Sequence, residues 1–212
     1  MKVGYFVLII MILIFFGVGC KTTRPPSVGE LAANPRLILP PEEEKTMTEE
    51  PQTMEFVPRP LGILPDKEIQ NKIARIKTDY GDIVFALFPD EAPLAVSNFV
   101  YLANQGFYNG LAFHRVEPDF VIQGGDPLGN GAGGPGYSFT DEPVMRYYLE
   151  GIVAMANSGP NTNGSQFFIM LKDTPQLPKL YTIFGKVISG MEFVKSIKVG
   201  DKMIKVAVED TK

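Results

Sequence analysis

The chain is predicted to form a mostly-β domain, a closed barrel or a sandwich with two helices, behind an N-terminal segment that does not share this pattern. Sixteen of its 21 glycines fall in the 142 residues after residue 70, and such a load of glycine indicates many tight turns. The same segment contains many short apolar runs, of which two have helical spacing. Many short strands with few helices are typical of a barrel or a sandwich.

The elements follow in order along the chain. Apolar runs at 74–78 and 83–88 are joined by Asp-Tyr-Gly-Asp, which predicts a strand, a turn and a strand. Segment 93–104 has apolar residues at helical spacing; Pro93 suits a first helical position, and Gly106 suits the reversal after it. Further strands are predicted at 112–115, 120–123, 152–155, 166–170, 181–187 and 204–209, and a second short helix at 191–197.

The first twenty residues have the pattern of a secretory signal: a lysine, an apolar run at 3–18 and a small residue before Cys20. This end resembles the lipobox of bacterial lipoproteins, although Gly17 stands where that motif usually has Leu. The resemblance implies a signal peptide of residues 1–19 and lipidation of Cys20. An uncleaved anchor helix is the alternative, and its sixteen apolar residues are slightly short for a hydrocarbon core of ~30 Å. Both predict a membrane-anchored protein of the cell envelope, outside the cytoplasm.

Residues 20–70 are predicted to form a disordered linker after the lipidated cysteine. They hold nine of the 18 prolines, with acidic clusters at 42–44 and 49–50 and few aromatic residues. A flexible chain of this length has a root-mean-square reach of about 40 Å. We therefore expect a spacer that holds the folded domain, residues 71–212, away from the membrane. A proline-rich docking segment is the alternative.

Several function classes are disfavoured by the residues present. A net charge of −4 and a pI near 5.1 disfavour binding of nucleic acid, which usually requires a basic domain. One cysteine and one histidine argue against an intrachain disulfide and an ordinary multi-histidine metal site. Residues 129–134 fit the pattern G-x-G-x-x-G, but Pro135 and Gly136 follow at once, so we interpret this loop as a surface turn. We expect no cofactor and no metal.

The most informative residue is Arg115, which stands among apolar neighbours on a predicted strand. A buried arginine is costly unless it is paired or used. Arg115 and Gln123 alternate with Phe120, Val121 and Phe168, which predicts an apolar groove with a few fixed donors. That is the usual composition of a small binding site.

Two stretches, Phe-His-Arg-Val through Gln-Gly-Gly-Asp at 113–126 and Ala-Met-Ala-Asn through Gln-Phe-Phe-Ile at 154–169, closely resemble the signature stretches of cyclophilins. Flanking pieces that match the family lie at 81–83, 87–93, 133–137 and 183–187. The resemblance covers about residues 72–210. It implies a closed eight-stranded antiparallel barrel capped by two helices, and cis–trans isomerisation of X–Pro peptide bonds without a cofactor.

The resemblance also implies the roles of single residues. Arg115 is expected to stabilise the prolyl nitrogen of the twisted amide, with Phe120 and Gln123 as further catalytic residues. The residues expected to bind substrate are His114, Val121, Ala156, Asn157, Gln166, Phe168, Leu177 and Tyr181. Phe113 and Phe167 are expected in the core instead. We expect a monomer that acts on proline-containing segments; a proline-peptide binding or chaperone module with little catalysis is the alternative.

Some positions depart from the family pattern. Val121 stands where the family often has Met, which predicts a shallower pocket wall. Gln176 stands where the family commonly has a Trp that contacts cyclosporin A, so drug binding is not implied. Glu117 and Asp119 place acid near Arg115, which leads to the hypothesis that basic substrates are favoured.

Overall fold

The computed structural model describes residues 62–211. The predicted signal peptide, Cys20 and the linker up to residue 61 lie outside the described residues. Within residues 62–211, no helix is both long enough and apolar enough to cross a membrane.

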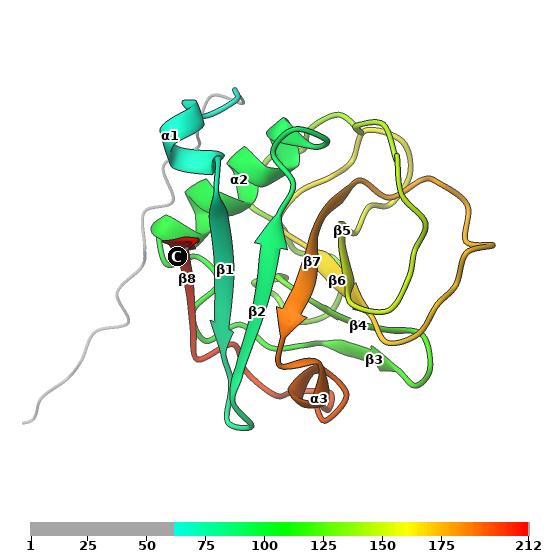
Figure 1. Cartoon of the computed structure of the whole chain (residues 1–212). Helices are drawn as coiled ribbons and strands as arrows, with labels where there is room; N and C mark the ends of the chain where they lie inside the picture. The colour runs from blue at the N-terminus through cyan, green and yellow to red at the C-terminus, as the bar shows by residue number, and fades with distance from the viewer. Residues whose placement is uncertain (1–61, 212) are drawn as a thin grey trace, which may run out of the picture. The chain divides into compact units, whose positions relative to one another are not determined.

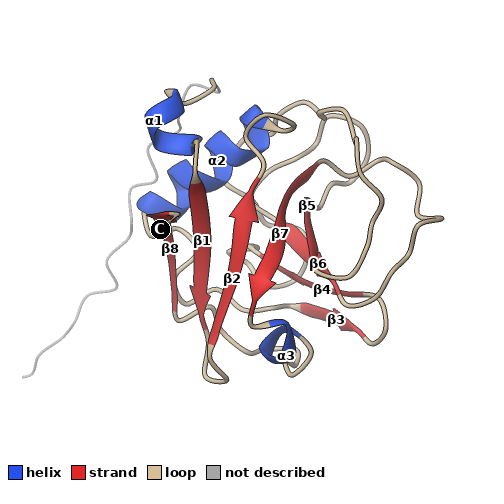
Figure 2. Ribbon diagram, in the orientation of Figure 1, coloured by secondary structure: helices blue, strands red, loops and turns tan. Residues whose placement is uncertain are grey.

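The described chain is built around one sheet of eight strands, in which all pairs are antiparallel (Figures 1 and 2). The strand order is β3-β4-β6-β5-β7-β2-β1-β8. The strands are β1 (Lys72–Lys77), β2 (Asp82–Leu87), β3 (Arg115–Glu117), β4 (Val121–Gly124), β5 (Ile152–Met155), β6 (Phe167–Met170), β7 (Ile183–Ser189) and β8 (Lys205–Asp210). The helices are α1 (Asp66–Ile69), α2 (Pro93–Asn104) and α3 (Met191–Val194).

The predicted eight antiparallel strands are confirmed, but closure of the barrel is not. The sheet begins at β3 and ends at β8, and these two described strands do not pair with each other. The backbone before β3 bonds to a loop instead: the Phe113 amide donates to the Asp201 carbonyl at 2.8 Å, and the Gly200 amide donates to the Phe113 carbonyl at 3.0 Å. The backbone before β3 thus pairs with the segment before β8, while β3 and β8 themselves stay unpaired with each other, so the sheet is an open half-barrel.

The packed chain begins before residue 71, which corrects the predicted end of the linker. Helix α1 lies within the predicted linker, and its last residue, Ile69, is buried in the core. The Leu64 amide donates to the Ser97 hydroxyl of α2 at 2.9 Å. Ile69 in the core and Leu64 packed against it order this segment. The prolines around these two residues led to the prediction of a linker instead.

The predicted helix at 93–104 coincides with α2, and the predicted strands fall within two residues of observed ones, except at 112–115. There, of the four residues, Arg115 alone belongs to a named strand. The predicted second helix ends earlier, because α3 is one turn long. Expected core residues Phe113 and Phe167 are confirmed as fully buried.

Two hydrophobic clusters hold the sheet in place. In the larger one, the Phe99 ring of α2 lies with its centroid 5.0 Å from that of Tyr108 and 5.7 Å from that of Phe167. The smaller cluster includes buried Val121, Tyr148 and Phe168, which belong to β4, a loop and β6. Because this second cluster is rigid apolar packing, it forms a firm floor for the side chains described next.

Candidate active site

A pocket of about 270 Å³ lies over β3, β4 and β6. Nine residues line it: Arg115, Phe120, Val121, Gln123, Ala156, Asn157, Phe168, Leu177 and Tyr181. All nine are among the eleven side chains predicted from the sequence to form the site. His114 and Gln166 are the two predicted residues outside this pocket.

The sheet register explains how distant residues meet. Arg115 of β3 pairs with Gln123 of β4, and Gln123 pairs in turn with Phe168 of β6. Residues directly opposite each other on neighbouring strands project from the same face of the sheet. A row of a cation, an amide and an aromatic ring therefore crosses three strands.

The pocket has an apolar floor. Val121 and Phe168 are buried, with 2% and 5% of their surface exposed. Tyr181 meets Phe168 edge to face with the ring centroids 5.5 Å apart, and Leu177 packs against the same cluster. A floor of this shape favours a compact apolar group and excludes water from beneath it.

A chain of side-chain hydrogen bonds fixes the cation at the rim. The Arg115 Nη1 donates to Gln123 Oε1 at 3.2 Å, and Gln123 Nε2 donates to Gln166 Oε1 at 2.9 Å. The Arg115 side chain remains 46% exposed; its Nε lies 3.6 Å from Glu117 Oε1, and its guanidinium carbon lies 5.9 Å from the centroid of the Phe120 ring. The guanidinium is thus held in position and is still accessible to a ligand.

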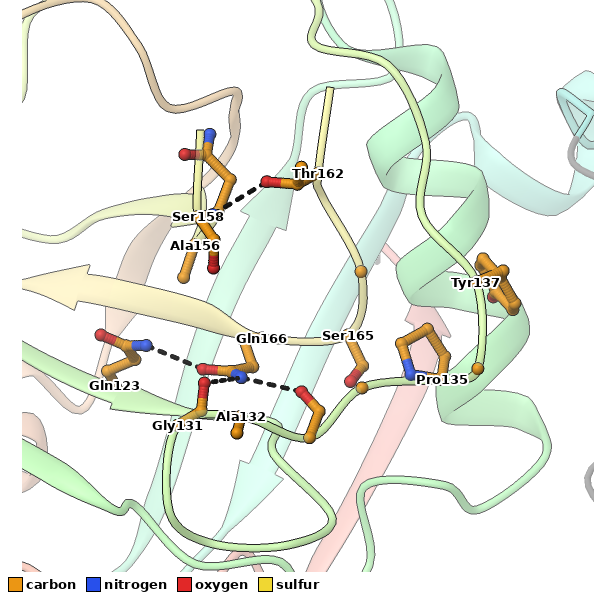
Figure 3. Close-up of a pocket in the computed structure, with 15 residues that line it drawn as sticks. Gln123, Gly131, Ala132, Pro135, Tyr137, Ala156, Ser158, Thr162, Ser165 and Gln166 are labelled. Carbon is orange, nitrogen blue, oxygen red and sulfur yellow. Dashed lines mark hydrogen bonds between the residues drawn. The ribbon is translucent and has the colours of Figure 1, made fainter. Parts of the chain in front are cut away.

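A second pocket of about 390 Å³ adjoins the first, and Figure 3 shows its lining. Gln123, Ala156 and Asn157 line both pockets, so the two form one groove. Gln166 lies in this second pocket, where its Nε2 donates to the carbonyls of Gly131 and Gly133 at 2.9 and 2.8 Å (Figure 3). The other lining residues are Ala132, Gly134, Pro135, Gly136, Tyr137, Ser158, Thr162, Gly164 and Ser165.

The glycine-rich loop is a surface turn, as predicted, and it also lines the second pocket. Residues 131–137 form one wall of the groove. Four of these seven residues are glycines, and the carbonyls of Gly131 and Gly133 accept hydrogen bonds from Gln166 Nε2. The sequence signal that pointed here was the family match at 133–137.

His114 lines neither pocket, so its expected role in substrate binding stays a prediction. Its neighbour Arg115 points into the site, and successive residues of an extended chain point to opposite sides. Both ring nitrogens of His114 are buried and have no hydrogen-bond partner among the described residues. Burial lowers the pKa of the imidazole below its ordinary value; the charge of Asp126 opposes this effect and that of Arg115 adds to it.

The sequence analysis missed Tyr148, which is fully buried behind the site. Its hydroxyl donates to the Tyr181 carbonyl at 2.9 Å and accepts from the Tyr181 amide at 3.0 Å. These two bonds fix the backbone of a pocket residue. No motif marked Tyr148, because its contact with Tyr181 joins positions 33 residues apart.

Within residues 62–211, no three His, Cys, Asp or Glu side chains are arranged to hold a metal ion. The site offers instead an apolar pocket, a fixed cation at its rim and polar side chains along an adjoining groove. These features define a β-rich domain with an apolar pocket and an adjoining polar groove.

Comparison with known proteins gives the family. The family model described as cyclophilin type peptidyl-prolyl cis-trans isomerase/CLD matches residues 73–211. Peptidyl-prolyl cis-trans isomerase B of Bacillus subtilis is 50% identical over 133 residues, which cover 62% of this chain and 93% of that protein. The chain therefore belongs to the cyclophilin family, and it is a peptidyl-prolyl cis-trans isomerase.

Solved structures agree with this assignment. A cyclophilin-type isomerase of Cryptosporidium parvum superposes with a TM-score of 0.62 at 39% identity, covering 66% of this chain and 99% of its own. A second structure of that protein, in the presence of the dipeptide Ala-Pro, superposes with a TM-score of 0.60 at 38% identity, covering 65% of this chain and 99% of its own.

Proposed function

We propose that the chain accelerates rotation about X–Pro bonds by non-covalent stabilisation of the twisted amide, with Arg115 as the catalytic cation. The observation that carries the proposal is the position of Arg115, held by Gln123 at the rim of an apolar pocket of about 270 Å³. Rotation breaks amide resonance and meets a barrier of ~18–20 kcal/mol. An enzyme lowers this barrier when it binds the twisted form better than either planar form.

The proline ring occupies the floor formed by Val121 and Phe168. As resonance is lost, the lone pair localises on the prolyl nitrogen, and the nearby guanidinium of Arg115 stabilises it. Gln123 holds a substrate carbonyl, and Ala156 and Asn157 hold the peptide backbone. A fixed donor in a partly dry site requires little reorganisation during the reaction, which makes such help effective. The relative solved with Ala-Pro supports a proline ligand.

The second pocket receives a residue that flanks the proline. It is contiguous with the first pocket through Gln123, Ala156 and Asn157. Its lining combines small residues with backbone carbonyls and the polar side chains Ser158 and Thr162. This composition accepts a range of side chains, as expected of an enzyme that acts on many X–Pro sequences.

The variant Arg115→Ala tests the mechanism. In a protease-coupled assay on an X–Pro peptide, kcat/KM should fall by about 10²–10³, the usual loss for one preorganised donor, while peptide binding weakens only modestly. Arg146→Ala is the matched control: that side chain is 43% exposed, pairs with Glu91 and lies over the Phe88 ring outside both pockets. Unchanged turnover in Arg115→Ala would reject the mechanism and favour a binding or chaperone module.

We also infer that the enzyme acts on secreted or envelope proteins from a membrane tether, as a monomer. The sequence pattern at 1–19 and Cys20 supports the tether. Fractionation of cells that make the wild type and Cys20→Ser tests it: the wild type should sediment with membranes and carry lipid on Cys20. A wild type without lipid that still sediments would favour the uncleaved anchor helix.

A further inference from the structure

Asp126 lies two residues after the end of β4, and no role was predicted for it from the sequence. Its side chain is buried, with 1% of the residue exposed. Its Oδ1 accepts the Leu128 amide at 2.8 Å, and its Oδ2 accepts the amides of Asn130 and Gly131 at 3.0 and 2.5 Å. One carboxylate thus accepts hydrogen bonds from three backbone amides of the loop that follows it.

The same loop is the anchor of the hydrogen-bond chain at the active site. Gln166 Nε2 donates to the carbonyls of Gly131 and Gly133, and Gln166 Oε1 accepts from Gln123, which in turn accepts from Arg115. The Gly131 amide donates to Asp126, and the Gly131 carbonyl accepts from Gln166. Gly131 therefore connects the hydrogen bonds of Asp126 to the side-chain hydrogen bonds that reach Arg115.

Close packing leaves the loop little freedom on this side. A Cβ added to Gly133 would overlap Asp126 Oδ1 and come within 2.9 Å of Leu128 Cγ. By contrast, a Cβ added to Gly134 would meet nothing within 4 Å. The carboxylate therefore fits against the backbone at one glycine and leaves the next one open.

We propose that Asp126 is a positioning residue for the isomerase reaction: its carboxylate holds the 127–133 loop in the shape that fixes Gln166, and through Gln166 and Gln123 it sets the position of Arg115. Asp126 lines neither pocket; it contacts residues that do, such as Gly131. It acts at the far end of a relay whose other end is the catalytic guanidinium.

The charge of the carboxylate is what the loop requires. Burial raises the pKa of Asp126, but the backbone amides of Leu128, Gly131 and Asn130 outweigh it and hold the pKa below its ordinary value. A carboxylate only accepts hydrogen bonds, so it can face several amides at once. An asparagine would direct an NH₂ donor at amides that are themselves donors.

The test compares Asp126→Asn with Glu142→Gln in the full chain. Glu142 is the matched control, because its carboxylate also accepts two backbone amides, those of Leu94 and Ala95, each at 2.8 Å, and it lines neither pocket. Asp126→Asn should lower kcat/KM by roughly tenfold to a hundredfold, the loss typical of a small displacement at a remote site. Glu142→Gln should leave kcat/KM unchanged.

Two readouts separate positioning from general loosening of the fold. The NMR resonance of the Arg115 Nε–H group should shift in Asp126→Asn and in Gln166→Ala but stay in place in Glu142→Gln. In the double variant, Asp126→Asn should cost little further activity once Gln166 is gone, because both act through one relay. Additive losses, or an unmoved Arg115 resonance, would overturn the proposal.

A second variant covers the case in which Asp126→Asn does not fold. Gly133→Ala displaces the carboxylate from the loop side, so it should shift the Arg115 resonance and lower kcat/KM. Gly134→Ala, which adds the same methyl group to open space, should leave the Arg115 resonance in place. If the Arg115 Nε–H resonance were the same in Gly133→Ala and Gly134→Ala, the proposal that Asp126 positions Arg115 through Gln166 and Gln123 would be refuted.

Discussion

Replacing Tyr148 by phenylalanine removes a single hydroxyl from a ring that is fully buried behind the pocket. The hydroxyl makes two hydrogen bonds, at 2.9 and 3.0 Å, to the backbone of Tyr181. The ring itself stays in contact with Phe168 and Tyr181, at centroid distances of 6.5 and 6.4 Å. The substitution thus isolates the effect of the two bonds from that of the packing.

The expected loss follows from those bonds. Each is worth about 0.5–1.5 kcal/mol net, and an unsatisfied buried partner costs about 1–3 kcal/mol. Tyr181 is only partly buried, so water replaces some of what is lost. We expect Tyr148→Phe to lower the free energy of unfolding by about 2 kcal/mol, which lowers Tm by roughly 4–8 °C for a domain of this size.

Urea denaturation followed by far-ultraviolet circular dichroism measures this loss, a suitable probe because the chain contains no tryptophan. Tyr147→Phe is the matched control, since that neighbouring ring is 61% exposed and lies beneath the Lys179 amine at 5.1 Å. It should change stability by less than about 0.5 kcal/mol. A Tyr148→Phe variant as stable as the Tyr147→Phe control would show that the two bonds do not hold Tyr181.

Two further predictions concern pH and substrate choice. The pKa of His114 in the folded chain lies below its ordinary value of 6.5. At a pH between these two pKa values, the unfolded chain therefore binds a proton on this ring that the folded chain does not bind. Stability should therefore decline as pH falls from about 6.5 toward the folded pKa, and Tm measured against pH should show a smaller decline in His114→Gln. Glu117 lies 3.6 Å from Arg115, so peptides with Lys before proline should react up to about fivefold faster than peptides with Glu, a ratio that Glu117→Gln should reduce.

Each of these predictions has an outcome that would contradict it. Identical Tm profiles for the wild type and His114→Gln would mean that the buried imidazole does not link folding to pH. Equal rates on the Lys and Glu peptides would mean that the exposed Glu117 carboxylate does not influence substrate choice at the ionic strength of the assay.

The local signals in the sequence were sufficient for most elements. The spacing of apolar residues with Pro93 at the start gave α2 with its observed bounds, because a helix is a local structure. The boundary at residue 71 was wrong for a nonlocal reason: Ile69 is ordered by packing on the core, and nothing in its neighbours along the chain reports that contact.

By itself, the sequence predicted the chemistry of this protein: the family resemblance over about residues 72–210 identified nine residues that line one pocket, seven of them within 113–126 and 154–169. Tertiary structure alone decided that the His114 ring nitrogens are buried without a partner among the described residues, that the sheet stays open, and that the glycine-rich loop lines a second pocket and is held by Asp126. The physical reason is the separation along the chain of the residues that decide each feature. Residue types and strand alternation are properties of a short segment, whereas the orientation of a loop and the pairing of sheet edges depend on hydrogen bonds between segments far apart in the chain.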